Sequence, residues 1–147
     1  MSVTKPTFLV LALVFCSVRF SSAQVTAGIY TNGFLTQIGV GTNPEENFFG
    51  ELRLFAGDDY NNFFGIEALG QYNFKRSDWH NISGGLMLGT YEYEEGLRVG
   101  LPVLLAIKPI QAHRNFSVML EATPLYKESW ALRGSMGIRY TIGSGRQ

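Results

Sequence analysis

Bulky apolar residues alternate with small, polar or charged residues along most of this chain. In the segment 48–57, FFGELRLFAG, Phe48, Leu52 and Leu54 share one face, whereas Glu51 and Arg53 share the other. Successive side chains of a β-strand point to opposite sides of the sheet, so a period of two indicates strands rather than helices. The pattern therefore predicts an all-β fold.

The alternation recurs in eight segments, at 25–30, 33–42, 48–57, 63–74, 79–91, 96–108, 115–125 and 130–142. Short turn sequences separate them. One is Asn32-Gly33, and Asn-Gly between apolar alternations is the strongest short hairpin signal. Because all connections are short, we predict an antiparallel up-and-down eight-stranded transmembrane β-barrel, if its apolar side faces lipid. In an alternative reading, 25–42 is one bent strand, which leaves seven strands and prevents simple closure.

The N-terminal segment has the pattern of an export signal. A positive start that includes Lys5 precedes an apolar run at 8–18, and small residues up to Ala23 suit a signal peptidase. We therefore predict a removable signal peptide at 1–23 and a single barrel domain at 24–147. The apolar run is too short for a good spanning helix.

Composition removes several classes of function. The 12 basic and 12 acidic residues give a formal net charge of zero, which offers no electrostatic reason for a nucleic-acid partner. The sole cysteine, Cys16, lies in the leader, and Phe15 stands before it where a lipoprotein needs a small residue. The domain thus has no disulfide or thiolate metal site. Two histidines alone fall short of the four ligands of a closed zinc site, so we expect no metal and no cofactor.

Alternation alone leaves two orientations open. In a soluble, lipocalin-like barrel that carries an apolar ligand, the apolar face would point inward. We favour the opposite arrangement, because an eight-stranded barrel has little room for so many Leu, Ile, Val and Phe side chains. The polar face instead combines small residues with charges of both signs, which suits a narrow interior where buried charges must be paired. The predicted interior charge network comprises Glu51, Arg53, Glu67, Arg98, Lys108, Glu121, Arg133 and Arg139.

Aromatic residues gather near the predicted strand ends. Tyr and Trp suit the boundary between headgroups and hydrocarbon, and strands of about ten tilted residues match the bilayer core. The expected girdle residues are Phe48, Phe49, Phe63, Phe64, Phe74, Trp79, Tyr91, Tyr126, Trp130 and Tyr140.

At this level of pattern the chain from residue 24 onward resembles the small eight-stranded outer-membrane barrels of Gram-negative bacteria, the class of OmpX and the membrane domain of OmpA. The sharpest local match is the segment 135–142, SMGIRYTI, which is similar to the C-terminal assembly signal of that class. The matching positions are Gly137, Tyr140 and Ile142, although Gly143 to Gln147 follow where the family usually ends. The resemblance implies recognition by the outer-membrane assembly machinery.

Catalysis has weak support in the sequence. Some barrels of this class resemble lipid A–modifying enzymes, which need a His, a Ser and a carboxylate. His80 and Ser83 are the nearest candidates, but their odd spacing places them on opposite faces of one strand. His113 falls in a predicted turn.

The predicted outward turns are short, near 31–32, 58–62, 92–95 and 126–129. The second and third of these turns carry five acidic residues, which raises the hypothesis of divalent cations bridging to lipopolysaccharide, with simple solvation of the turns as the alternative. These residues are Asp58, Asp59, Glu92, Glu94 and Glu95.

Together the patterns predict a monomeric integral protein of the cell outer membrane. Its partners would be outer-membrane lipid and the assembly machinery, and its role would be structural or in envelope maintenance, without catalysis.

Overall fold

The computed structural model describes residues 24–33, 35–57, 64–92 and 94–143. The described chain forms strands throughout: β1 (Val25–Thr31), β2 (Leu35–Gly41), β3 (Phe48–Gly57), β4 (Phe64–Arg76), β5 (His80–Tyr91), β6 (Glu94–Gly100), β7 (Val103–Ile107), β8 (Phe116–Tyr126) and β9 (Trp130–Ile142). Across these segments we find no helix with the length and hydropathy needed to cross a bilayer.

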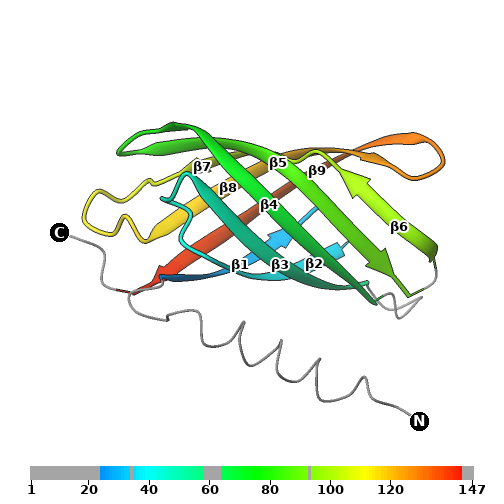
Figure 1. The fold of residues 1–147 in the computed structure, drawn as a ribbon. Helices are drawn as coiled ribbons and strands as arrows, with labels where there is room; N and C mark the ends of the chain where they lie inside the picture. Colours follow the sequence, from blue (N-terminus) through cyan, green and yellow to red (C-terminus); the bar gives the residue numbers. More distant parts are fainter. Residues whose placement is uncertain (1–23, 34, 58–63, 93, 144–147) are drawn as a thin grey trace, which may run out of the picture.

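The strands close into an antiparallel barrel (Figure 1). Neighbours in sequence pair with one another except β6 and β7, and β1 pairs with β9 from Val25↔Ile142 to Thr31↔Met136, which closes the cylinder. Gln24 and Gly143 lie at one end of the barrel, together with the turns at 42–47, 77–79 and 108–115. We call this the terminal end and the opposite one the distal end. The predicted up-and-down topology is confirmed.

The predicted strand 96–108 is divided in two at Leu101-Pro102. Proline has no N–H to donate, and the ladder is interrupted at Pro102, whereas Pro124 stays within the paired strand β8. Both parts, β6 and β7, pair with β5 on one side and β8 on the other, so they occupy one position in an eight-position barrel. Hydrogen bonds from Gly85 N to Pro102 O, at 3.1 Å, and from Leu101 N to Pro124 O, at 3.0 Å, hold this break.

The alternative of one bent strand over 25–42 is wrong. β1 and β2 form a hairpin around Asn32-Gly33, in which Leu35 N donates to Asn32 Oδ1 at 2.8 Å. Gly33 has a φ of 91°, a left-handed conformation that a residue with a Cβ adopts only with strain.

The side chains are arranged as in a membrane protein rather than a soluble barrel. On the outer wall Phe48 is 75% exposed and Leu132 is 74% exposed, whereas Arg53 and Glu67 inside the barrel have no exposed surface. This orientation contradicts the soluble lipocalin-like alternative, which needs the apolar residues inside.

Most of the expected girdle residues are exposed near strand ends. Phe48, Phe74, Trp79 and Tyr140 lie toward the terminal end, and Phe64, Tyr126 and Trp130 toward the distal end. The prediction is wrong for Phe49 and Tyr91, which are buried in the interior, and Phe63 lies outside the described residues. Phe49 alternates in phase with Glu51, and Tyr91 with Gly89. The alternation along the strand, rather than nearness to a strand end, therefore decides whether these side chains point inward or outward.

Two apolar clusters share the interior with the polar side chains. One contains Tyr30, Phe49, Leu104, Ala106 and Met119, and the other Leu69, Met87 and Leu125.

Candidate functional site

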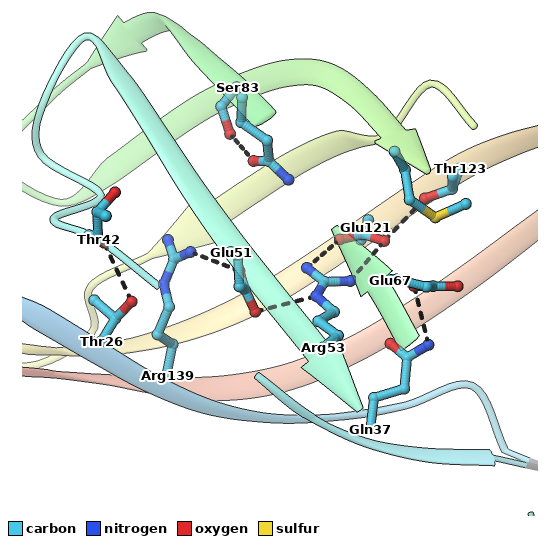
Figure 2. Close-up of polar contacts among 12 residues, drawn as sticks. Thr26, Gln37, Thr42, Glu51, Arg53, Glu67, Ser83, Glu121, Thr123 and Arg139 are labelled. Carbon is cyan, nitrogen blue, oxygen red and sulfur yellow. Dashed lines mark hydrogen bonds and ion pairs between the residues drawn. The ribbon is translucent and has the colours of Figure 1, made fainter. Parts of the chain in front are cut away.

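Six charged side chains form an alternating series across the barrel interior, which we call the interior network. In order of contact they are Arg139, Glu51, Arg53, Glu121, Arg133 and Glu67. They project from β3, β4, β8 and β9. Figure 2 labels all of them except Arg133, and its dashed lines run from Arg139 through Glu51 and Arg53 to Glu121. The series carries equal numbers of positive and negative charges, so its formal charge is zero.

Arg53 is the centre of the network. Its Nη1 and Nη2 donate to the two carboxylate oxygens of Glu121 at 3.0 and 2.7 Å, and its Nε donates to Glu51 Oε1 at 3.1 Å (Figure 2). The guanidinium also lies 4.0 Å from the centroid of the Tyr30 ring. A bidentate Arg–carboxylate pair of this kind is among the stronger hydrogen-bonded contacts in proteins, and it joins β3 to β8 across the lumen.

Glu67 receives several donors at once. Arg133 contacts both of its carboxylate oxygens, Tyr91 Oη donates to Oε1 at 2.6 Å, and Gln37 Nε2 donates to Oε2 at 3.4 Å. Arg133 also lies 3.9 Å from Glu121, which connects this cluster to Arg53. At the other end of the series, Arg139 Nη1 lies 3.6 Å from Glu51 Oε2.

The other two predicted network residues lie elsewhere. The half-buried Arg98 places its guanidinium 4.4 Å from the centroid of the Tyr91 ring, and so it adjoins the network through an aromatic side chain. Lys108 is buried near the terminal end, where its Nζ lies 2.7 Å from Glu45 Oε1. The structure therefore separates Lys108 from the central series.

Glycine makes the close approach of these groups possible. A Cβ on Gly39 would collide with the Glu51 carboxylate and would lie 3.0 Å from the Tyr30 ring. The small residues that alternate on the inner face thus provide the space that the buried charges and rings occupy.

The turn at 42–47 covers part of the terminal end, and we call it the mouth turn. Asn73 Nδ2 donates to the carbonyls of Pro44 and Glu46 at 2.8 and 2.6 Å. The Glu45 carboxylate accepts from Asn81 Nδ2 at 3.0 Å and pairs with Lys108. Residues of β4 and β5, together with Lys108 directly after β7, thereby hold the turn that connects β2 to β3.

The candidate catalytic residues have other contacts. Ser83 Oγ donates to Gln71 Oε1 at 3.0 Å, whereas the His80 ring lies 4.0 Å from that of Trp79. His113 is exposed in the turn between β7 and β8. Within the described ranges no three His, Cys, Asp or Glu side chains are placed to hold a metal ion. Of the five acidic residues in the predicted turns, Asp58 and Asp59 lie outside those ranges and Glu92 is exposed. The prediction is wrong for Glu94 and Glu95, which belong to β6 because the strand begins two residues earlier than expected.

Sequence reasoning missed several interior partners. Tyr30 supports Arg53, Gln37 donates to Glu67, and Thr123 Oγ1 donates to Glu121 Oε1 at 2.9 Å. The alternation could have identified such residues as inward-facing. Tyr30, for example, is in phase with Thr26 and Gly28 on the inner face of β1. Glu45 had no such signal, since it lies in a turn.

A closed antiparallel barrel with an apolar exterior and a paired polar interior is the architecture of small transmembrane β-barrels. Comparison with solved structures supports this class. The chain is similar to the N-terminal β-barrel domain of Pseudomonas aeruginosa OprF, with a TM-score of 0.59 and 12% identity over 82% of this chain and 97% of that one.

Two further structures are similar to this one. A chain from a de novo design of transmembrane β-barrels gives a TM-score of 0.55 and 13% identity over 82% of this chain and 92% of that one. The outer-membrane protein Ail of Yersinia pestis gives 0.53 and 10% identity over 82% of this chain and 99% of that one. No family model and no curated protein matches the sequence. The shared feature is thus the fold of an eight-stranded transmembrane β-barrel.

Proposed function

We propose that this protein is an integral protein of the cell outer membrane with a structural role in the envelope and no catalytic activity. The observation that carries the proposal is the side-chain orientation, with Leu, Ile, Val and Phe on the outer wall and paired Glu and Arg inside. A charged side chain facing lipid at the midplane costs about 2–4 kcal/mol, so the inward position of the charges suits a bilayer.

The interior favours a structural role over a wide pore. The Arg53–Glu121 and Arg133–Glu67 pairs cross the lumen, and two apolar clusters share the space with them. Barrels of eight strands have interiors that side chains fill. Since the inner wall is occupied in this way and the outer wall suits lipid, the proposed functional state is a monomer in contact with outer-membrane lipid.

Export and assembly complete the proposal. The signal peptide at 1–23 lies outside the described residues and remains a sequence prediction. The proposed assembly signal lies on β9, where Tyr140 and Ile142 face outward and pair in register with Ala27 and Val25 of β1. Gly137 lies on the same strand, opposite Tyr30. A signal on the closing strand is accessible to the assembly machinery before β1 docks.

Membrane fractionation combined with a gel heat-shift assay tests the function. The expressed and processed protein should require detergent for extraction, and its unboiled form should migrate differently from the boiled form. Recovery in the periplasm or medium without detergent would contradict the proposal.

A further inference from the structure

We propose that the outer wall of β3, β4 and β5 binds one glycerophospholipid whose headgroup carries a phosphate and a primary amine. The headgroup would lie at the terminal end and an acyl chain in a hollow of the wall. This inference rests on the proposed membrane location. Phosphatidylethanolamine is the ligand that we commit to.

The acyl-chain site is a hollow of about 510 Å³ on the lipid-facing wall. Gly50 and Gly70, which are directly paired across β3 and β4, form its floor, and Phe48, Tyr72 and Leu86 are among the residues around it. A Cβ on Gly70 would meet nothing within 4 Å, and one on Gly50 would meet just a backbone oxygen at 3.6 Å. Packing within the protein does not require glycine at these positions, and the missing side chains leave the hollow open to an acyl chain.

A polar pocket of about 520 Å³ adjoins this hollow, and Tyr72 lines both. Arg76, Ser77 and Asp78 line the pocket on the turn between β4 and β5, and Glu45 of the mouth turn lines its other side. The Tyr72 ring, which lies 4.8 Å from the Phe48 ring, borders both spaces, and the glycerol region of a lipid would lie beside it. The site is therefore apolar at one end and charged at the other.

The charges in the pocket suit a zwitterionic headgroup. The Arg76 guanidinium offers several N–H donors, of which one donates to the carbonyl of Glu45, and guanidinium groups match phosphate in geometry. Asp78 provides a carboxylate for the ammonium, and its present partner, Arg114, forms an exposed ion pair of a kind that contributes little. A primary ammonium donates hydrogen bonds to a carboxylate, whereas a quaternary choline cannot, so the site should favour ethanolamine.

The separation of the two parts matches one leaflet. Gly70 and Arg76 are six residue steps apart along β4, or about 20 Å of strand. At a tilt of about 45° this is about 14 Å along the bilayer normal, close to the thickness of half of a hydrocarbon core of about 30 Å. A lipid with its phosphate at Arg76 would thus place an acyl chain over Gly50 and Gly70.

A second hollow offers a matched control. It has a volume of about 730 Å³ and includes Ala122 and Gly134 in its lining, and a Cβ on Gly134 would meet nothing within 4 Å. Gly134→Leu therefore fills an outer-wall space of the same kind at another site. Lys75→Gln likewise removes an exposed positive charge next to Arg76 without altering the pocket lining.

The experiment is native mass spectrometry of the full processed protein, released from bilayers of equal phosphatidylethanolamine and phosphatidylcholine with identical acyl chains. The wild type should retain one lipid, with the ethanolamine form several-fold enriched. Gly70→Leu and Arg76→Gln should each abolish the adduct, and Asp78→Asn should remove the preference for ethanolamine. Gly134→Leu and Lys75→Gln should behave as the wild type.

Each variant is first checked by the heat-shift assay, and Gly50→Leu replaces Gly70→Leu if the latter does not fold. A wild type that inserts but retains both lipids equally, or variants that retain the adduct, would overturn the lipid site and leave the membrane proposal standing. A wild type that does not insert would overturn the membrane proposal itself.

Discussion

The guanidinium of Arg53 has no contact with solvent and pairs with two carboxylates, those of Glu51 and Glu121. Replacing Arg53 with Met would leave both carboxylates buried without their main partner. Removal of one member of a buried pair typically costs about 3–5 kcal/mol. We expect a loss of this size in the free energy of unfolding, measured by urea titration of the protein in lipid vesicles.

The matched control is Arg114→Gln, because Arg114 forms an exposed pair with Asp78 at 2.9 Å. An exposed pair contributes about 0–1 kcal/mol, so this variant should unfold almost as the wild type does. The double variant Arg53→Met/Glu121→Met should recover part of the free energy of unfolding that Arg53→Met loses, because it removes one of the two carboxylates left without Arg53. Equal effects of Arg53→Met and Arg114→Gln would show that burial does not govern the network.

One residue on the outer face, at the strand position shared by β6 and β7, offers a test of contact with lipid. Leu101, at the break between them, is half exposed toward the lipid side. Leu101→Arg should destabilise the inserted barrel by about 2–4 kcal/mol if this residue lies at the midplane. Refolding into vesicles, followed by urea titration, measures the change.

Leu132→Arg serves as the control on β9, because Leu132 lies close to Trp130 at the distal end. Near an interface the same substitution costs about 0–1 kcal/mol. If both variants assembled with wild-type stability, the outer wall would not face hydrocarbon.

The contacts of the mouth turn should limit access to the barrel interior from the terminal end. Glu45 accepts from Asn81 and pairs with Lys108, so Glu45→Ala should loosen the turn over the terminal end. In a Cys16→Ser background, a cysteine introduced by Ser83→Cys should then react several-fold faster with a small charged thiol reagent. Glu46→Ala is the control, because the contact of Glu46 with Asn73 runs through its backbone carbonyl. Equal rates in both variants would show that Glu45 does not hold the turn.

At the level of strands, the sequence predicted most of the architecture because alternation is a local property. The turn signal at Asn32-Gly33 identified the first hairpin correctly. A proline can interrupt the ladder of a strand, as Pro102 does, but Pro124 stays paired within β8, so the presence of a proline did not by itself predict the division at Pro102. The inward position of Tyr91 followed from its phase with Gly89, but its place at a strand end suggested a girdle residue instead.

The contacts across the barrel could not be predicted in the same way. Arg53 and Glu121 are 68 positions apart in the chain, and their meeting depends on closure and on the register of every strand between them. Alternation indicates that both side chains point inward, but it does not indicate their positions along the barrel axis. For the same reason the sequence could not separate Lys108 from the central network, since its partner Glu45 lies in a turn with no period.

Closure of the whole molecule depends on β9, which pairs with both β8 and β1. If Tyr140 belongs to the assembly signal, Tyr140→Ala should slow the appearance of the heat-shifted form in cells. Tyr126→Ala removes a similarly exposed aromatic ring from β8 at the distal end and should assemble at the wild-type rate. Equal slowing in both variants would indicate a general loss of aromatic contacts with lipid rather than a signal.

The most direct test of the membrane assignment measures which side chains contact the hydrocarbon of a bilayer. Spin labels are placed singly at residues 117–120 of β8 in the Cys16→Ser background, and their collision rates with oxygen and with a water-soluble nickel reagent are recorded in bilayers. Labels at Val118 and Leu120, which face outward, should collide often with oxygen, whereas labels at the buried Ser117 and Met119 should not. High nickel collision at Val118 and Leu120, with low oxygen collision, would contradict the membrane assignment.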